Sequence, residues 1–480
     1  MNSHRGIWLL LALCAVHEEL PAQTPTEPCR LTSPWLPSVS AQCGTVSVAE
    51  NPAEPDGRQV ELFVARVPSF NAAPLPDPLV LLAGGPGQAA SDLYLGIRGA
   101  FEPVRRDRDI IILDQRGTGR SNSLACDLDE PGMEAADPER LPELMTQCLM
   151  ELDGNPRFYT TSVAVSDLER VREALDVQAW NIYGVSYGTR VALHYLRRHP
   201  DRARAVVLDG VVPPEIALGP AIAYNAQQAM ELAFTRCDDD AECAARFPDL
   251  GARLEALTDR LGEEPVAVQL PDPLSGAPVQ RPFSLLHLKS VLRLMSYSPR
   301  TVALLPLLIT EAHGGNYGPF TAQAYMMIEE VEANLSVPMH NSVVCTEDVP
   351  FFAGEQGDPS GTYLGSSIVD ALLAVCSVWP RGRLDEDFKE PITSDRPILL
   401  LSGEADPITP PEYGFQVLSG LSNARHLVGP GQGHGQVSVG CVPRLLRAFL
   451  ENPSPEDLDA DCLQQEHSSP FFLDFNGPAP

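Results

Sequence analysis

Basic residues are scarce in this 480-residue sequence, which has 34 lysines and arginines against 64 aspartates and glutamates. The resulting net charge of −30 argues against a nucleic-acid partner, because the phosphates would be repelled. The acidic residues are spread along the whole chain, as expected of a solvated surface. No internal repeat and no low-complexity segment is present. The acidity therefore excludes one class of partner without indicating a site.

Long apolar runs are also missing, since no stretch reaches the roughly 18 apolar residues that a membrane-spanning helix needs. Near the N-terminus, Arg5 precedes an apolar run over residues 7–16, and Ala22 ends a short segment suited to cleavage. This pattern predicts a signal peptide over residues 1–22. We therefore expect an exported protein, periplasmic or secreted, with no membrane span in its mature chain.

No two cysteines have the C-x-x-C spacing, so neither a zinc site nor a dithiol redox site is indicated. We expect no metal and no cofactor. Ten of the 11 cysteines follow the predicted signal peptide, and an oxidising compartment favours disulfides. The connectivity does not follow from the sequence. The simplest pairing joins neighbours: Cys29 with Cys43, Cys126 with Cys148, Cys237 with Cys243, Cys345 with Cys376, and Cys441 with Cys462.

Short apolar runs alternate with helical segments along much of the chain. Runs with no polar alternation are typical of strands that are buried on both faces. A helix is predicted over 163–175. Strands are predicted over 42–48, 60–67, 78–82, 109–113, 179–183, 205–210, 397–401 and 424–428. The order predicts an α/β fold with a mostly parallel sheet that helices cover on both faces.

This alternation stops between residues 214 and 380, where the sequence is mainly helical and irregular. Helices are predicted there over 221–234, 250–261, 284–294 and 322–333. A last helix over 442–450 closes the chain's α/β part. We therefore predict a core formed by residues 23–213 and 381–480, interrupted by a helical cap over 214–380.

Ser186 stands at the centre of a G-x-S-x-G motif over residues 184–188. A predicted strand precedes the motif, and an apolar helix start over 191–196 follows it. Strand, sharp turn and helix form the context of a nucleophile elbow, in which flanking glycines avoid a clash with neighbouring backbone. A plain glycine-rich turn is the alternative. We predict that Ser186 is a catalytic nucleophile.

A serine nucleophile needs a histidine base and a carboxylate that orients it, in the chain order serine, acid, histidine. Asp406 follows the predicted strand 397–401, with Glu404 as a rival nearer the strand end. His434 lies in a glycine-rich loop after the last strand. The other candidates are too close to the serine, in the insertion or within a strand: His194, His199, His287, His313, His340 and His426.

Acyl transfer also requires donors for the developing oxyanion. One predicted donor is the backbone N–H of Tyr187, directly after the nucleophile. The other comes from Gly84 and Gly85, in the loop after the strand 78–82. A tight turn is the competing interpretation of this loop, but its position favours the oxyanion role.

Three stretches of the sequence resemble motifs of one peptidase family. Residues 83–87 read Ala-Gly-Gly-Pro-Gly and resemble the H-G-G-P-G motif of proline iminopeptidases, with Ala83 replacing the histidine. Residues 114–121 resemble their D-Q-R-G-x-G-x-S motif, and 403–411 resemble the acid loop of exported tripeptidyl aminopeptidases with a TAP-like C-terminal region. The resemblance implies an α/β-hydrolase fold with a helical cap, and release of residues or short peptides from a free N-terminus.

The resemblance also implies that cap carboxylates bind the substrate's ammonium group. Residues 342–350 resemble a recurrent segment of the exported relatives, which makes Glu347 the candidate. Glu329, Glu330 and Glu332 are alternatives, and a solvated helix face is the competing interpretation for all four. The sequence thus predicts a serine exopeptidase acting through an acyl-enzyme on peptides with a free N-terminus. The alternative is a carboxylic-ester or amide hydrolase acting on small molecules.

Overall fold

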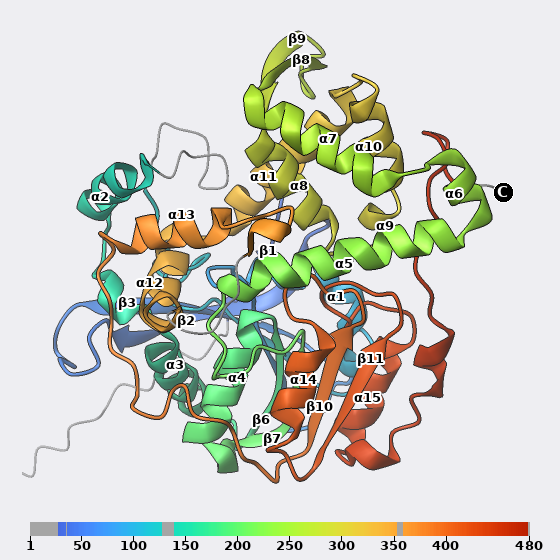
Figure 1. Ribbon diagram of the computed structural model, residues 1–480. Coiled ribbons are helices and arrows are strands. Elements are labelled where there is room, and N and C mark those ends of the chain that lie inside the picture. The colour runs from blue at the N-terminus through green and yellow to red at the C-terminus, as the bar shows by residue number, and fades with distance from the viewer. Residues whose placement is uncertain (1–26, 35, 127–138, 353–358, 479–480) are drawn as a thin grey trace, which may run out of the picture.

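The computed structural model describes residues 27–34, 36–126, 139–352 and 359–478, so the predicted signal peptide lies outside the described residues. Its centre is a nine-stranded sheet with the order β1-β2-β3-β5-β4-β6-β7-β10-β11 (Figure 1). The strands are β1 (Glu27–Leu31), β2 (Val39–Ala49), β3 (Gln59–Val67), β4 (Leu79–Leu82), β5 (Ile110–Leu113), β6 (Trp180–Val185), β7 (Ala203–Asp209), β10 (Ile398–Gly403) and β11 (Ala424–Gly429). From β5 to β11 all neighbours are parallel, which confirms the predicted mostly parallel sheet. The short antiparallel β1 was not predicted.

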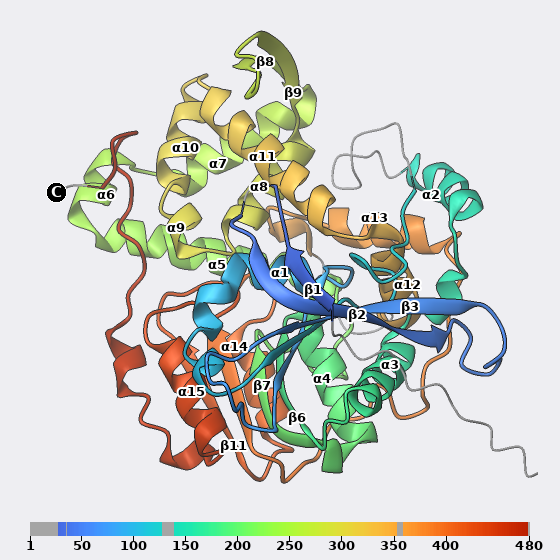
Figure 2. The same cartoon turned by 180° about the vertical axis from the view of Figure 1, so that it is seen from behind.

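The strands β4 and β5 are apolar at every residue because helices cover both faces of the sheet. In β4, Leu79 and Leu81 pack on one face and Val80 and Leu82 on the other, as the alternation of a strand requires. The helices α1 (Ala90–Phe101) and α15 (Val442–Glu451) cover the first face. The second face is covered by α3 (Thr161–Ala174), α4 (Tyr187–Arg198) and α14 (Pro411–Leu418) (Figure 2). α2 (Leu141–Glu151) precedes α3 in the chain.

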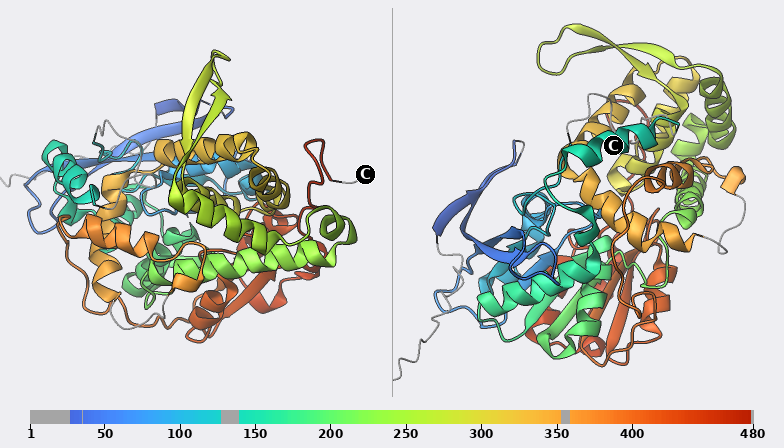
Figure 3. Two further views of the ribbon diagram at one scale, coloured as in Figure 1. Left: turned by 45° about the horizontal axis from the view of Figure 1, so that its top comes forward. Right: turned by 90° about the vertical axis from the view of Figure 1, so that its left-hand side faces the viewer.

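Helices fill the chain between β7 and β10 and lie over one end of the sheet (Figure 1). They are α5 (Pro220–Asp239), α6 (Ala241–Arg246), α7 (Leu250–Glu263), α8 (Leu285–Met295), α9 (Pro299–Val302), α10 (Leu305–His313), α11 (Gly318–Asn334), α12 (Val337–Glu347) and α13 (Ser367–Cys376). All four predicted helices are present as α5, α7, α8 and α11. The hairpin of β8 (Val266–Pro271) and β9 (Pro278–Phe283), which projects from these helices in Figure 3, was not predicted. The boundaries at residues 214 and 380 remain our proposed division into core and cap.

The five disulfides of the described residues join the neighbouring cysteines, as the simplest pairing predicted. One of them, Cys345–Cys376, connects α12 to α13. Within the described ranges, no helix combines the length and the apolar character needed to cross a membrane.

The D-Q-R-G loop after β5 is held by buried charges. Asp114 accepts hydrogen bonds from the backbone N–H and hydroxyl of Ser91 and from the backbone N–H of Arg120. Arg116 donates to both oxygens of Asp167 on α3, over 2.6 and 2.7 Å, and neither side chain is appreciably exposed. Since a bidentate pair fixes both partners, this contact orients the loop against α3.

We expect Asp167→Asn to lower the free energy of unfolding by about 3–5 kcal/mol, because it leaves the buried Arg116 charge without its counter-ion. The control is Glu173→Gln on the same helix. Glu173 pairs with Arg170 over 2.8 Å, but the two side chains are 48% and 69% exposed. Such a surface pair contributes about 0–1 kcal/mol. Urea unfolding of both variants checks the difference, and equal losses would contradict it.

Candidate active site

Ser186 occupies the turn between β6 and α4, with φ of 55° and ψ of −125°. A positive φ is strained for a residue other than glycine and persists only where the surroundings hold it. The backbone N–H of Ser186 donates to the Asp209 carbonyl over 2.8 Å. A Cβ on Gly184 would lie 2.5 Å from the Gly188 carbonyl oxygen, and one on Gly188 would collide with the carbonyl of Leu82. The two glycines are therefore required by backbone packing, as predicted.

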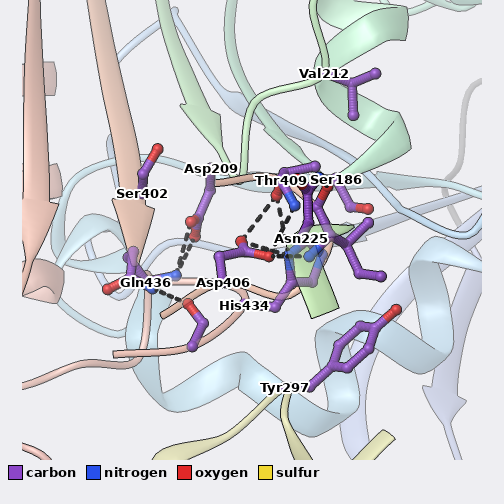
Figure 4. A network of polar contacts seen from close by, with 12 residues as sticks. Ser186, Asp209, Val212, Asn225, Tyr297, Ser402, Asp406, Thr409, His434 and Gln436 are labelled. Atoms are coloured by element: carbon purple, nitrogen blue, oxygen red, sulfur yellow. Dashed lines mark hydrogen bonds and ion pairs between the residues drawn. The ribbon is translucent and has the colours of Figure 1, made fainter. Parts of the chain in front are cut away.

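Asp406 and His434 are in direct contact at the ends of β10 and β11. Asp406 Oδ2 lies 2.7 Å from His434 Nδ1 and accepts a hydrogen bond from the Thr409 hydroxyl (Figure 4). Its Oδ1 accepts from the backbone N–H groups of Ile408 and Thr409, each over 2.9 Å. The rival Glu404 is exposed and accepts instead from the backbone N–H of Gly431. The geometry thus favours Asp406 as the partner of the histidine.

The Asp406 contact determines which nitrogen of His434 carries the proton. A carboxylate accepts only, so Nδ1 is the protonated nitrogen and Nε2 is left as a base. Burial lowers the pKa of His434, but the charge and hydrogen bond of Asp406, with a smaller contribution from Asp209, outweigh burial and raise it above the ordinary 6.5. Its side chain remains 11% exposed.

Ser186 and His434 both lie against the Asp209–Gly210 turn at the end of β7. Ser186 bonds to the Asp209 carbonyl, and a Cβ on Gly210 would lie 3.0 Å from His434 Cε1. Figure 4 shows the two side chains in the same part of the site. The structure records no hydrogen bond between the Ser186 hydroxyl and His434 Nε2. Catalytic hydrogen bonds often tighten only when substrate is bound, so the geometry remains suitable for a nucleophile and its base.

Asp209 holds the loop that carries His434, and it was not predicted as a site residue. Its carboxylate is fully buried and accepts hydrogen bonds from the backbone N–H groups of Gln436 and Val437 and from the Tyr183 hydroxyl. Gln436 follows His434 by two residues, so these bonds fix the loop that carries the histidine. An aspartate at the end of a fully buried strand was the available signal in the sequence.

The helical segment between β7 and β10 reaches the loop that carries His434 through Tyr297, which sequence reasoning also missed. The Tyr297 carbonyl accepts a hydrogen bond from the backbone N–H of His434 over 2.8 Å. The two rings meet edge to face with centroids 5.1 Å apart. From α5, Asn225 donates to the Ile408 carbonyl in the acid loop over 3.2 Å. The candidate site therefore lies where the helices over the sheet meet the loops after β10 and β11.

The loop that contains Gly84 and Gly85 lies against Ser186, and Tyr187 follows Ser186 directly. A Cβ on Gly84 would lie 3.1 Å from the Ser186 Cβ and 3.6 Å from its hydroxyl oxygen, so this loop faces the serine directly. Gly85 adopts a φ of 103°, which favours glycine. Tyr187 is the first residue of α4, where backbone N–H groups have no partner within the helix. Its side chain is buried, with the hydroxyl near Gln115 and Thr161.

Glu347, the candidate amine-binding residue, lies at the end of α12 and is wholly buried. Its two oxygens accept hydrogen bonds from the backbone N–H and hydroxyl of Thr161 over 2.7 and 2.8 Å, and Arg190 lies 3.8 Å away. Burial raises the pKa of Glu347 to about 7, although Arg190 and Thr161 act to lower it. A solvated helix face therefore does not describe Glu347, and its amine-binding role stays a prediction. The alternatives Glu329, Glu330 and Glu332 are exposed on α11.

Two family descriptions match the chain: an α/β hydrolase fold over residues 77–256 and a TAP-like protein over residues 361–462. The sequence is 35% identical over 135 residues to a proline iminopeptidase of Neisseria gonorrhoeae, which covers 28% of this chain and 32% of that protein. It is 28% identical over 205 residues to the serine protease Hip1 of Mycobacterium tuberculosis, which covers 39% of each.

The chain has the α/β-hydrolase fold, and these matches support its resemblance to the proline iminopeptidase and tripeptidyl aminopeptidase family. The TAP-like match begins at residue 361, within the predicted cap. Among solved structures, a proline iminopeptidase of Mycobacterium smegmatis is 16% identical, with a TM-score of 0.40 over 86% of this chain and 99% of that one. The matches to the curated relatives span only about a third of those proteins.

Proposed function

We propose that this α/β-hydrolase is a serine exopeptidase that releases N-terminal residues or short peptides, with Ser186, Asp406 and His434 as its triad. The observation that carries the proposal is the 2.7 Å contact of Asp406 with His434. His434 lies against the Asp209–Gly210 turn, which also holds the strained Ser186. Support for peptide substrates comes from the similarity to a proline iminopeptidase and a serine protease.

In the proposed reaction, His434 Nε2 takes the proton of the Ser186 hydroxyl as its oxygen attacks the scissile carbonyl carbon. The backbone N–H groups of Tyr187 and of the Gly84–Gly85 loop donate to the resulting oxyanion. His434 then gives the proton to the leaving amine, which departs and leaves the acyl group on Ser186. Water, deprotonated by His434, hydrolyses the acyl-enzyme and restores the serine.

We further propose that the enzyme acts after export. The five disulfides of the described residues fit an oxidising compartment, and the N-terminal pattern over residues 1–22 provides the export signal.

We expect the enzyme to require a free α-ammonium on its peptide substrate. An exopeptidase measures a fixed distance from the chain end to the nucleophile, and a carboxylate that pairs with the ammonium is the simplest way to fix it. Removing one partner of a buried charged pair costs about 2–5 kcal/mol, or about 30- to 5,000-fold in kcat/KM. The test measures kcat/KM on aminoacyl and tripeptidyl amides, each with a free and with an acetylated N-terminus. Simple aryl esters are measured for comparison. Equal cleavage of acetylated and free peptides would contradict it.

The second candidate function is a carboxylic-ester or amide hydrolase acting on small molecules. It is favoured by one observation: both oxygens of Glu347, the predicted amine ligand, are already bonded to Thr161. The same substrates distinguish the two functions. Rapid cleavage of aryl esters with no turnover of any free peptide amide would support the ester hydrolase.

A further inference from the structure

One segment of the inserted helices contacts both sources of the proposed oxyanion donors. This α12 segment, residues 335–347, consists of the two residues before α12 and α12 itself. Its first residues meet the loop that contains Gly84 and Gly85, and its last residue reaches Tyr187 through Thr161. The α12 segment takes no part in the proposed mechanism itself.

The first contact is made to the glycine loop. Leu335 forms an isolated β-bridge with Gln88, and the backbone N–H of Ser336 donates to the Gly87 carbonyl over 2.9 Å. His340 Nδ1 lies 3.1 Å from the Pro86 carbonyl oxygen, which can only accept, so Nδ1 is the donor. A Cβ on Gly87 would lie 2.6 Å from the Ser336 carbonyl oxygen. The loop therefore packs against the α12 segment with no space to shift outward.

The second contact is a directional chain of hydrogen bonds. Gln115 Nε2 donates to the Tyr187 hydroxyl over 3.1 Å, and Thr161 Oγ1 donates to Glu347 Oε2 over 2.8 Å. When Glu347 is ionised, Thr161 gives its one hydroxyl proton to the carboxylate, so Tyr187 is the donor in the 2.8 Å contact between Tyr187 and Thr161. Every donor in the chain thus points toward Glu347, and a carboxylate at the end of such a chain strengthens its members.

The α12 segment is itself held in place. Cys345 is bonded to Cys376 on α13, and α12 is buried along most of its length. Directly after the helix, Asp348 accepts from Arg190 of α4 over 2.9 Å and from the backbone N–H of Leu218. A segment fixed in this way can transmit its position to the groups that it contacts.

Resting on the proposed function, we propose that the α12 segment positions the oxyanion hole, with His340 holding the Gly84–Gly85 loop and Glu347 holding Tyr187. Both are positioning residues, since neither touches the reacting atoms. An oxyanion donor acts only at hydrogen-bond distance from the developing charge, and losing one donor costs about 10²- to 10³-fold in kcat. Displacing a donor without removing it should cost less, so we expect losses of about 10- to 100-fold.

The test compares His340→Ala, His340→Asn and Glu347→Gln in the full-length enzyme, on an aryl ester and on a free peptide amide. His340→Ala should lower kcat about 10- to 100-fold on both substrates with little change in KM. His340→Asn should recover most of this loss, because its amide nitrogen can take the place of Nδ1 and donate to Pro86. The matched control is His313→Ala, an exposed cap histidine, which should keep wild-type kcat.

Glu347→Gln should also lower kcat on both substrates. The glutamine oxygen would accept from the backbone N–H of Thr161, so the amide nitrogen would face the Thr161 hydroxyl. That hydroxyl would then turn toward Tyr187 and leave the Tyr187 proton without an acceptor. A loss confined to the free peptide would overturn the positioning role of Glu347 and favour amine pairing. If Glu347→Gln does not fold, Tyr187→Phe removes the same link while keeping the backbone N–H, and should give a similar loss.

Failure of this inference can be told apart from failure of the proposed function. A fluorophosphonate that labels Ser186 in the wild-type enzyme, together with measurable turnover, establishes the nucleophile independently. If the wild type is labelled and turns over the free peptide amide but His340→Ala and either Glu347→Gln or Tyr187→Phe keep kcat within twofold, the positioning role is wrong and the proposed function stands. If the wild type is neither labelled nor active on any substrate, both are wrong.

Discussion

Ser186→Ala should lower kcat by about 10⁶-fold, the loss typical when a serine hydrolase loses its nucleophile. The substitution removes one oxygen atom from a residue whose backbone N–H bond to Asp209 does not depend on the side chain. The thermal unfolding midpoint should therefore stay close to that of the wild-type protein. Turnover of an aryl ester and thermal melting of the purified variant check both statements.

Ser402 provides the matched control for this experiment. Its hydroxyl lies 2.9 Å from His426 Nε2, so it is a second serine in contact with a histidine. However, Ser402 is wholly buried, the buried Nδ1 of His426 has no hydrogen-bond partner among the described residues, and burial lowers the pKa of His426 to about 4. Without a carboxylate behind it, this histidine cannot act as the base of a triad. Ser402→Ala should keep turnover near the wild-type value, and Ser186→Ala with activity within tenfold of wild type would refute the assignment.

The sheet could be predicted from the sequence because its strands carry a strong local signal. Strands such as Leu79–Leu82 and Ile110–Leu113 are apolar at every position, which follows from burial on both faces. The candidate site residues could be predicted for a related reason. Ser186, Asp406 and His434 each follow a predicted strand of the sheet, and the carboxyl ends of parallel strands meet at one edge of the sheet.

The elements that sequence reasoning missed lack this local signal. α12 (Val337–Glu347) is buried on nearly every side, so its apolar and polar residues do not follow the helical period that marks an amphipathic helix. The hairpin strands β8 and β9 are largely exposed and have prolines where they meet the turn, which weakens their strand pattern. Asp209 supports a loop 227 residues away, and no pattern within one segment indicates a contact of that separation.

Asp406→Asn should lower kcat by about 10⁴-fold through the tautomer of His434. Asp406 Oδ1 accepts two backbone N–H groups, so the amide oxygen of asparagine must take that place. The amide nitrogen then faces His434 Nδ1 and donates to it, which moves the histidine proton to Nε2. A protonated Nε2 cannot accept the proton of Ser186, although the side chains keep their positions.

The pH dependence of kcat/KM distinguishes this mechanism from a general loss of structure. In the wild-type enzyme His434 must be neutral, so activity falls as pH drops through a pKa that Asp406 raises above 6.5. The variant lacks the Asp406 charge while burial still disfavours the charged imidazole, so the pKa falls and the acid limb of its residual activity moves to lower pH. Profiles of both enzymes on an aryl ester measure this shift. An acid limb that stays in place, or a kcat within tenfold of wild type, would show that Asp406 is not the partner that orients His434.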